Sequence, residues 1–497
     1  MSVTAAVFLI ICLYLSHSIY FNVIIHPLRH IPGPKLWIAF PILRHLSAMR
    51  GRLDIDMRRW HNLYGKAVRF GPDEVSFISA EAWKDIYGHG HRQLPKVLSS
   101  ASNPSDIVNA NDADHARMRK VLSPAFSTKG LQSHEALITS YVDKLITRLK
   151  GAAESGSPTD MVKWYNLTTF DLIGDLAFGE SFGGLDNTRH HEWVATVFAS
   201  IKVIPFMRAC DHYPLLFRPL LALLPKSILR ARQKQAQHSQ MIVQKRLDAQ
   251  NTWGREDFMG LMLRHHGEEA HFASSELDAN ATILIIGGSE TTATLLSGAT
   301  YWLLRSPRAL EKVTSEVRSV MKTEADFTFS NIATRLTYMH ACLTEALRLY
   351  PPVPGLLQRL TTEASTHISG YELPHGTMVA VHQSAAYWSP SNFREPRCFI
   401  PERWLPEARD DPSSPFFSDN REVLQPFSTG PRNCIGKNLA YHEMRMILAK
   451  VLWNFDLELC EESKEWWDQK SFEIWEKPPL MCKLTHHEVS SPEPFTI

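Results

Sequence analysis

This sequence of 497 residues has no disulfide framework, no charge excess and no internal repeat. Its seven cysteines are odd in number and scattered, without the paired spacing of a zinc site. Lysine plus arginine totals 53 and aspartate plus glutamate totals 52, so the basic footprint of a nucleic-acid-binding protein is missing, and no nucleic-acid partner is expected. A glycine-rich dinucleotide fingerprint is also absent, which places any nicotinamide site on another protein.

The first 26 residues have the length and composition of a membrane anchor. Residues 3–25 contain no aspartate, glutamate, lysine or arginine, and a helix of that length would be about 34 Å long. A cleaved signal peptide is the alternative, but no positive charge precedes the stretch and no small-residue cleavage site closes it. Basic residues follow it and predict that the downstream chain faces the cytosol; they are Arg29, His30, Lys35, Arg44, Arg50 and Arg52.

The next composition change marks a domain boundary. Residues 27–36 hold three prolines and a glycine, which cannot continue a helix and which stiffen the chain. Beyond them no second break divides the sequence, and a hydrophobic content of 44% can fill a large core. We therefore expect an anchor over residues 1–26, a proline-rich hinge over residues 27–36 and one catalytic domain over residues 37–497.

One cysteine lies in a loop that exposes it. In the run FSTGPRNCIG, residues 427–436, Gly430 and the proline after it break regular structure. A helical pattern over residues 435–452 begins just after Cys434. The positive end of that helix and the neighbouring Arg432 favour a thiolate, and thiolates bind metals. A buried structural cysteine is the alternative for any lone cysteine.

The same run meets every fixed position of the pattern Phe-x-x-Gly-x-Arg-x-Cys-x-Gly and so resembles the haem-binding loop of the cytochrome P-450 family. The resemblance implies haem b, iron protoporphyrin IX, as the cofactor and Cys434 as the axial ligand of its iron. Phe427 would pack against the sulfur side of the macrocycle, and Arg432 would pair with a haem propionate. Gly430 and Gly436 would allow close approach of the backbone. A thiolate ligand favours O–O cleavage, which is monooxygenase chemistry.

A second motif lies within a predicted long helix over residues 276–305. The run GGSETT puts glycines and threonines, which are poor helix formers, in the middle of this helix. A second membrane span is the alternative, but Glu290 would make such a span costly. The run resembles the oxygen-activation segment of the same family, in which the helix opens near the haem. By this resemblance Gly287 and Gly288 give room for dioxygen. Glu290 relays protons and Thr291 donates a hydrogen bond to the bound oxygen.

Two further groups of residues resemble haem-supporting positions of the family. Glu345 and Arg348, on a predicted helix over residues 339–350, match a Glu-x-x-Arg motif, and Arg403 lies in the later run PERW. On an exposed helix the Glu345–Arg348 pair would contribute only a few tenths of a kcal/mol. By the resemblance, the three residues form a buried network that holds the cysteine loop.

Three more basic residues resemble haem-propionate contacts. His115 and Arg119 have helical i,i+4 spacing in the run DADHARMRK, for which an exposed basic turn is the alternative. Family members often carry tryptophan at the position of His115, so this residue departs from the usual pattern. Arg359 follows the run PPVPGLLQ and matches a strand position that supplies another propionate contact.

Helical patterns dominate the remaining chain, at residues 131–149, 164–177, 227–247 and 307–321. Alternation at residues 377–382, with glycines nearby, predicts short hairpins rather than a large sheet. The expected fold class is therefore mainly α with a small β region. With the resemblance, this becomes the cytochrome P-450 fold preceded by a single N-terminal transmembrane helix.

The resemblance spans nearly the whole chain. The stretch from residue 430 to residue 459 looks like filamentous-fungal members of the isotrichodermin hydroxylase type, which tailor secondary metabolites. It implies a haem-thiolate monooxygenase of the endoplasmic reticulum membrane that hydroxylates or otherwise tailors an apolar small molecule with O2. Electrons would come from NADPH through NADPH-cytochrome P-450 reductase, with cytochrome b5 as an optional second donor. A basic face near the thiolate would receive the reductase; it consists of Lys120, Arg432, Lys437 and Arg445.

Two other functions remain open from the sequence. A haem-thiolate isomerase or ring-expanding oxidase would use the same cofactor without net hydroxylation. A catalytically inactive membrane scaffold belongs to a different class, and it is expected to have lost Thr291 or Cys434, which are both present.

Overall fold

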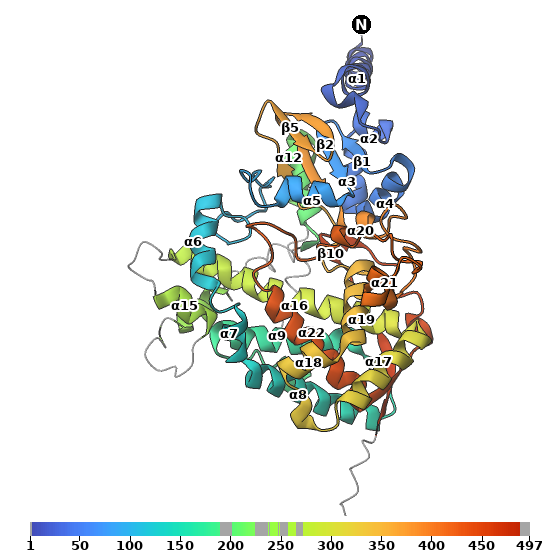
Figure 1. Ribbon diagram of the computed structural model, residues 1–497. Coiled ribbons are helices and arrows are strands. Elements are labelled where there is room, and N and C mark those ends of the chain that lie inside the picture. Colours follow the sequence, from blue (N-terminus) through green and yellow to red (C-terminus); the bar gives the residue numbers. More distant parts are fainter. Residues whose placement is uncertain are drawn as a thin grey trace, which may run out of the picture.

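The computed structural model describes residues 2–188, 201–223, 237, 239–246, 248, 257–264 and 272–487 (Figure 1). Its helices are α1 (Val3–Ile19), α2 (Lys35–Ala39), α3 (Ile42–Met49), α4 (Leu53–Tyr64), α5 (Ala80–Tyr87), α6 (Asp112–Leu122), α7 (Thr128–Gln132), α8 (Glu135–Glu154), α9 (Met161–Phe178), α10 (Gly184–Asn187), α12 (Ile204–His212), α13 (Pro214–Phe217), α15 (Phe258–Arg264), α16 (Ser274–Leu304), α17 (Pro307–Val320), α18 (Phe329–Arg335), α19 (Thr337–Leu349), α20 (Gln383–Tyr387), α21 (Pro406–Asp410) and α22 (Lys437–Asn454). Its strands are β1 (Ala67–Gly71), β2 (Glu74–Phe77), β3 (Thr159–Asp160), β4 (Arg359–Leu360), β5 (Ser365–Ile368), β6 (Tyr371–Pro374), β7 (Met378–Val381), β8 (Phe455–Leu459), β9 (Ser471–Phe472), β10 (Ile474–Trp475) and β11 (Met481–His486). The expectation of a mainly helical fold with a small β region is confirmed.

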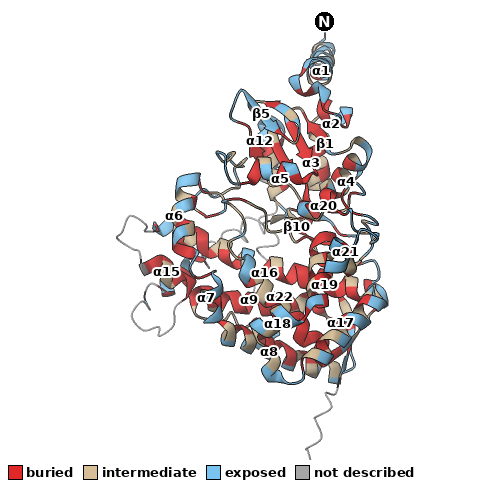
Figure 2. Ribbon diagram, in the orientation of Figure 1, coloured by how far each residue is buried: buried red, intermediate tan, exposed pale blue. Residues whose placement is uncertain are grey.

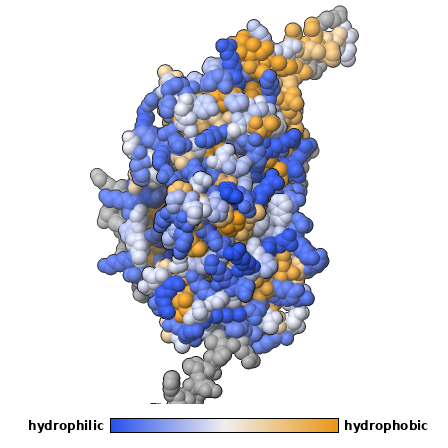
Figure 3. Space-filling view, turned by 45° about the vertical axis from the view of Figure 1, so that its right-hand side comes forward, coloured by the Kyte–Doolittle hydropathy of each residue, from blue (hydrophilic) through white to orange (hydrophobic). Residues whose placement is uncertain are grey.

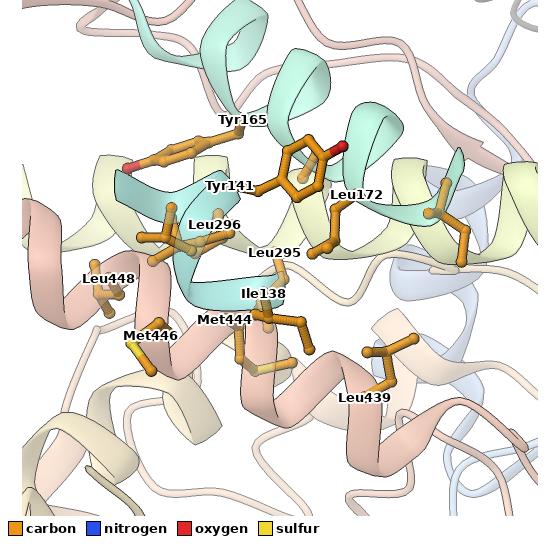
Figure 4. Close-up of a cluster of buried hydrophobic side chains, with 14 of the residues drawn as sticks. Ile138, Tyr141, Tyr165, Leu172, Leu295, Leu296, Leu439, Met444, Met446 and Leu448 are labelled. Atoms are coloured by element: carbon orange, nitrogen blue, oxygen red, sulfur yellow. The ribbon is translucent and has the colours of Figure 1, made fainter. Parts of the chain in front are cut away.

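The largest core lies among α8, α9, α16 and α22. Side chains from all four helices meet in one buried cluster, with Tyr141 from α8, Tyr165 from α9, Leu296 from α16 and Met446 from α22 (Figure 4). The Tyr165 hydroxyl is satisfied by the Thr300 hydroxyl of α16 at 2.8 Å. Because α16 is apolar around most of its circumference, it runs through the middle of the molecule rather than along its surface (Figure 2).

The predicted helices that frame the motifs are present. The patterns at residues 276–305, 339–350 and 435–452 correspond to α16, α19 and α22. Proline 351 explains the end of α19, because a residue before proline leaves helical geometry. The predicted helix at residues 227–247 lies largely outside the described residues. The expected opening of the long helix is not found, since α16 is continuous from Ser274 to Leu304.

The sheet region is larger than the hairpins that the sequence predicted. β5 and β6 do form an antiparallel hairpin. β7, however, belongs to a four-stranded sheet in the order β1-β2-β7-β4, where it pairs in parallel with β2 so that Val379 lies opposite Val75. Alternation along one strand shows that the strand exists, but it carries no information about a partner about 300 residues away, so the prediction of hairpins alone was wrong here.

The N-terminal helix projects from the body of the molecule (Figure 1). Among the described residues, only Thr4–Ile25 forms a helix that is long and apolar enough to cross a membrane, and none of its apolar window is buried. Its surface is strongly hydrophobic (Figure 3). The proline-rich segment after it is docked on the domain, because Leu28 and Ile31 are buried. A Cβ on Gly33 would also lie only 1.8 Å from the Arg69 carbonyl oxygen of β1.

Candidate active site

The loop that carries Cys434 is held against the end of α5. Gly430 has a φ of +77°, and a Cβ there would come within 1.7 Å of the Tyr87 carbonyl oxygen. Both facts require glycine at this position. The loop then closes on itself, because the Cys434 N–H donates to the Phe427 carbonyl at 2.9 Å and the Asn433 N–H donates to the Gly430 carbonyl at 3.1 Å. The sequence places Cys434 in a fixed turn, just before α22 begins.

The thiol environment differs from the expectation. Cys434 is accessible to solvent, yet protein surrounds it closely enough that desolvation raises the pKa of its thiol. The Gly436 N–H, Arg119 and Lys437 act in the opposite direction but do not reverse the shift. Arg432, which the sequence analysis credited with this effect, is directed elsewhere. The loop alone therefore does not give a thiolate, and a bound metal cation would supply the charge that deprotonates it.

Arg119 is placed on the cysteine loop itself. Its guanidinium donates to the Asn433 carbonyl oxygen at 2.6 Å and to the Asn433 side-chain oxygen at 2.5 Å. α6, which carries Arg119, is preceded by Asn111, whose side chain accepts the Asp114 N–H and caps the helix. Arg119 thus fixes the residue before Cys434.

Phe427 and Gly436 border the thiol in different ways. The Phe427 ring packs on the Tyr441 ring with centroids 5.2 Å apart. Gly436 has an ordinary φ of −81°, and a Cβ there would lie 3.9 Å from the Cys434 sulfur. The protein alone therefore leaves room for a small side chain at Gly436, in contrast to Gly430.

Four basic side chains gather near the start of α6, and we name them the cationic cluster: Lys96, His115, Arg359 and Arg432. Burial, followed by the charges of Arg359 and Arg432, lowers the pKa of Lys96 to about 7. Burial, followed by Arg432 and Arg119, lowers the pKa of His115 to about 4. Like charges raise each other's energy, so a cluster of this kind suits an anionic ligand.

The side chains of the cationic cluster form few hydrogen bonds and ion pairs with the rest of the described protein. Arg432 pairs with Asp112 at 2.6 Å and donates to the Ala110 carbonyl at 2.8 Å. Arg359 donates to the Gln358 carbonyl at 3.1 Å. Within the described part of the chain, however, Arg359 Nε and Arg432 Nη1 are buried without a hydrogen-bond partner. Buried N–H donors are normally satisfied, so these two indicate a missing acceptor.

These features fit the haem that the sequence implies. A thiol beside a cluster of basic side chains with two unused N–H donors fits an iron porphyrin with two carboxylates. The two orphaned donors, Arg359 Nε and Arg432 Nη1, match propionate oxygens as acceptors.

One face of α16 has free space beside it at Gly287, and we call it the open face. The residues of the GGSETT run lie on different faces of this helix. A Cβ on Gly287 would meet nothing within 4 Å, whereas one on Gly288 would come within 2.6 Å of the Ile173 side chain. Gly288 therefore serves the packing of α16 on α9 rather than space for dioxygen. Thr291 lies one turn after Gly287 on the open side, and its hydroxyl donates to the Gly287 carbonyl at 2.6 Å.

Glu290 does not accompany Thr291 on the open face. It is 4% exposed, and its carboxylate is paired with the ammonium group of Lys477 and accepts the Thr294 hydroxyl at 3.1 Å. Burial raises the pKa of Glu290, while the nearby Lys477 opposes that rise. The structure thus brings Glu290 to the C-terminal segment and leaves Thr291 facing the open side.

The predicted supporting residues meet in a buried network. Arg348 forms a bidentate pair with Glu345 at 2.7 and 2.9 Å, and Arg403 donates to Glu345 at 3.1 Å. The Ile400 N–H and the Trp404 indole also donate to this carboxylate, at 2.9 and 2.8 Å. Although burial raises the pKa of Glu345, the charges of Arg348 and Arg403 outweigh it and hold the pKa below its usual value.

This network connects to the cysteine loop through one tyrosine. Arg348 donates to the Tyr387 carbonyl at 2.9 Å, and the Tyr387 hydroxyl accepts the Gln425 N–H at 3.0 Å, two residues before Phe427. Arg403 also pairs with Asp419, which lies shortly before Gln425 in the segment that leads to the cysteine loop. Displacement of the arginines would therefore be transmitted to the loop.

Sequence reasoning missed Lys96, Asp419 and Lys477. Lys96 is linked to the site by an isolated backbone bridge to Arg359, and Lys477 reaches Glu290 across 187 residues. Neither link leaves a local pattern in the sequence. For Asp419 there was one indirect indication: the predicted network held two arginines and one glutamate, so a second carboxylate was needed to balance the charge.

Replacing Gly430 by alanine is expected to displace the loop, because the new Cβ would collide with the Tyr87 carbonyl oxygen. Gly370→Ala is the matched control: its φ of +84° carries the same backbone strain, but its Cβ would meet nothing within 4 Å. Haem content should fall severalfold in Gly430→Ala and stay near normal in Gly370→Ala. Equal haem content in the two variants would show that the contact with Tyr87 is unimportant.

Comparison with known proteins gives one consistent picture. The model of the cytochrome P-450 family matches residues 31–483. The chain is 60% identical to the cytochrome P-450 monooxygenase olcB of Penicillium canescens, across 96% of this chain and 97% of that protein. It is 52% identical to the trichothecene C-4 hydroxylase of Trichoderma arundinaceum, across 97% of this chain and 98% of that protein. It is 44% identical to the cytochrome P-450 monooxygenase astA of Talaromyces wortmannii, across 93% of each.

Proposed function

Because the chain belongs to the cytochrome P-450 family and is a monooxygenase that uses haem b, we propose that it oxidises an apolar small molecule in fungal secondary metabolism, by hydroxylation. The observation that carries this proposal is the Cys434 loop, which presents an accessible thiol beside the cationic cluster and its two unused N–H donors. The relative named as a trichothecene C-4 hydroxylase favours hydroxylation over isomerisation.

We assign the cofactor contacts as follows. Haem held through a thiolate would supply the oxygen-activating chemistry. Cys434 is the ligand, and Arg119 fixes its loop through Asn433. The cationic cluster receives the propionates, with the free N–H groups of Arg359 and Arg432 as donors. Burial and the charges of Arg432 and Arg119 lower the pKa of His115 to about 4 while no anion is bound, and a propionate beside it would act in the opposite direction; in either state His115 would offer a propionate an N–H donor.

Thr291 has the placement of a residue that accepts a hydrogen bond beside the reacting oxygen, rather than donating one as the sequence analysis expected, because its own proton is used by the Gly287 carbonyl. Its hydroxyl lies on the open face of α16, where Gly287 leaves space. The hydroxyl proton is donated to the Gly287 carbonyl, so the oxygen lone pairs remain free to accept a proton donor. The hydroxyl is thus held in a fixed orientation.

The Thr291→Ala variant is expected to bind haem but to form less product for each NADPH consumed. Without the hydroxyl, protons are no longer directed to one particular oxygen atom. Product formed per NADPH should fall severalfold, with the missing electrons recovered as hydrogen peroxide. Thr292→Ala is the matched control, since its hydroxyl is buried on another face of the same helix. NADPH, peroxide and product are measured in one assay, and coupling retained in Thr291→Ala would remove this role.

To test the reaction type, the chain is expressed with a fungal reductase under 18O2. The metabolites are then compared with those of cells that have the reductase but lack the chain. A hydroxylase places one 18O atom in its product. A new product without 18O would instead identify the isomerase or ring-expanding alternative, and an unchanged metabolite profile under conditions of full haem loading would contradict the proposal.

We propose that the reductase docks beside the cysteine loop. Lys120 and Lys437 are exposed there. Arg432 and Arg445, also expected at this face, have protein partners: Arg432 pairs with Asp112, and Arg445 donates to His340 at 3.0 Å. Lys120→Glu combined with Lys437→Glu should slow reduction by the reductase severalfold while dithionite reduction is unchanged. An unchanged rate of reduction by the reductase would exclude this face.

We also propose that the apolar N-terminal helix anchors the protein in the endoplasmic reticulum membrane with its catalytic domain in the cytosol. The exposed apolar surface of Thr4–Ile25 supports an anchor, and the basic residues after it support the orientation. In intact microsomes, a C-terminal tag should be digested by added protease. Protection of the tag would reverse the orientation.

A further inference from the structure

Asn280 of α16 holds a loop that comes from a distant part of the chain. Its side chain is fully buried. The amide oxygen accepts the Ile107 N–H at 2.9 Å, and the amide nitrogen donates to the Ser105 carbonyl at 3.3 Å and to the Glu276 carbonyl of its own helix at 2.8 Å. Binding the backbone at two alternate residues requires a donor and an acceptor on one side chain, which an amide has and a carboxylate lacks.

The loop that Asn280 holds, residues 105–110, has hydrogen bonds of its own. The Ala110 N–H donates to the Asp106 carbonyl at 2.9 Å. The Asp106 carboxylate accepts the Asn109 N–H at 2.8 Å, and Asp106 is buried. Because these bonds close the loop into a turn, a tether at Ser105 and Ile107 positions residues 105–110 as a unit.

The same loop is attached to the cationic cluster on its other side. The Lys96 ammonium group donates to the Val108 carbonyl, and Arg432 donates to the Ala110 carbonyl at 2.8 Å. Lys96 and Arg432 are both members of that cluster. Residues 105–110 therefore run from α16 to the side chains assigned to the haem propionates.

Asn280 lies on the same side of α16 as the open face. Gly287 and Thr291 follow it by seven and eleven residues, and at about 100° of rotation per residue both come within about 20° of its direction. A Cβ on Gly287 would meet nothing within 4 Å. The tether therefore fixes residues 105–110 to the side of the helix that has free space beside it. In the middle of this loop the apolar side chain of Val108 is 45% exposed.

We propose that Asn280 is a positioning residue for substrate binding: its amide fixes residues 105–110 as a preformed apolar wall beside the open face of α16. This inference rests on the proposed function and deepens it, because it names the residue that keeps one wall of the site in place. An apolar substrate then binds without having to order the loop, and that ordering would otherwise weaken its binding.

Two azoles bound to the ferric holoenzyme test this inference. Imidazole and 4-phenylimidazole both bind haem iron through a ring nitrogen, but only the second carries an apolar ring that can reach a wall of the site. Asn280→Leu keeps the approximate size of the side chain and leaves the Ile107 N–H and the Ser105 carbonyl without their partner. By Soret titration, the Kd of 4-phenylimidazole should rise severalfold in this variant, and the Kd of imidazole should be unchanged.

Asn166→Leu is the matched control. Asn166 is also buried, and its amide donates to the Val162 carbonyl one turn earlier in α9, as the Asn280 amide does to the Glu276 carbonyl in α16. Both azoles should bind Asn166→Leu as they bind the wild type. An equal loss of affinity for both azoles in Asn280→Leu would indicate a general effect on the haem site and would overturn the inference.

Val108→Ala tests whether Asn280 acts through this loop. Because Val108 is exposed, the variant should fold, and it should weaken 4-phenylimidazole binding severalfold in the wild type. In Asn280→Leu the wall is already displaced, so the second substitution should add little. Fully additive effects, or unchanged 4-phenylimidazole binding by Val108→Ala alone, would contradict the inference. If Asn280→Leu does not fold, hydrogen exchange of the wild-type holoenzyme still decides: the Ile107 N–H should be protected, and exchange at the rate of a free loop would exclude the tether.

The reduced carbon monoxide spectrum keeps this inference apart from the proposed function. A wild-type protein without a thiolate-type band would contradict the proposed function. A thiolate-type band of wild-type amplitude in Asn280→Leu, with both azole affinities unchanged, would overturn the role of Asn280 alone.

Discussion

Glu345→Ala is expected to abolish a stable haem-binding fold. The carboxylate accepts hydrogen bonds from Arg348, Arg403, Trp404 and the Ile400 N–H, and both arginines are 0% exposed. Its removal leaves the buried Arg348 guanidinium without a carboxylate partner and Arg403 with Asp419 alone, at a cost of about 3 to 5 kcal/mol. Native domains are stable by only about 5 to 15 kcal/mol, so a loss of this size removes a large share of the total.

The measurement is the midpoint of denaturant unfolding together with haem content per chain. Glu422→Ala is the matched control, because Glu422 also pairs with a basic residue, Lys84, but those side chains are 71% and 72% exposed. That exposed pair should contribute about 1 kcal/mol or less. If Glu345→Ala were no less stable than Glu422→Ala, the buried network would not be what supports the cysteine loop.

The sequence was most informative where chemistry is local. Gly430, Cys434 and the helix that begins three residues later lie within one short run, so the loop could be recognised from its own residues. The pair of Glu345 and Arg348 likewise lies on one turn of helix. The expected family, mainly helical fold and haem cofactor are confirmed.

Predictions were weaker where the outcome depends on distant parts of the chain. The sequence could place Glu290 on a helix but not its partner, since Lys477 follows in a segment with no motif. Gly288 was read as space for a ligand, whereas Ile173 of α9 occupies the position that a side chain would take. The pKa of Cys434 was expected to fall, but desolvation by the folded protein raises it. Each of these outcomes is set by tertiary packing, which local patterns do not encode.

Cys434→Ser is expected to remove the thiolate ligand completely, because a serine hydroxyl is a poor donor to iron. The hydroxyl fits the space of the thiol, so the Cys434 N–H bond to the Phe427 carbonyl and the packing of Phe427 on Tyr441 should persist. Cys398→Ser is the matched control, since Cys398 is an exposed free cysteine outside the loop. Both variants should therefore fold, and only Cys434→Ser should change the ligand of the haem iron.

The reduced carbon monoxide difference spectrum of these two variants is the most direct test of a haem-thiolate centre at Cys434. Cys398→Ser should show the thiolate-type Soret band of the wild type at full amplitude, and Cys434→Ser should show none. A thiolate-type Soret band that persists unchanged in Cys434→Ser would exclude this cysteine as the iron ligand and contradict the assigned active site.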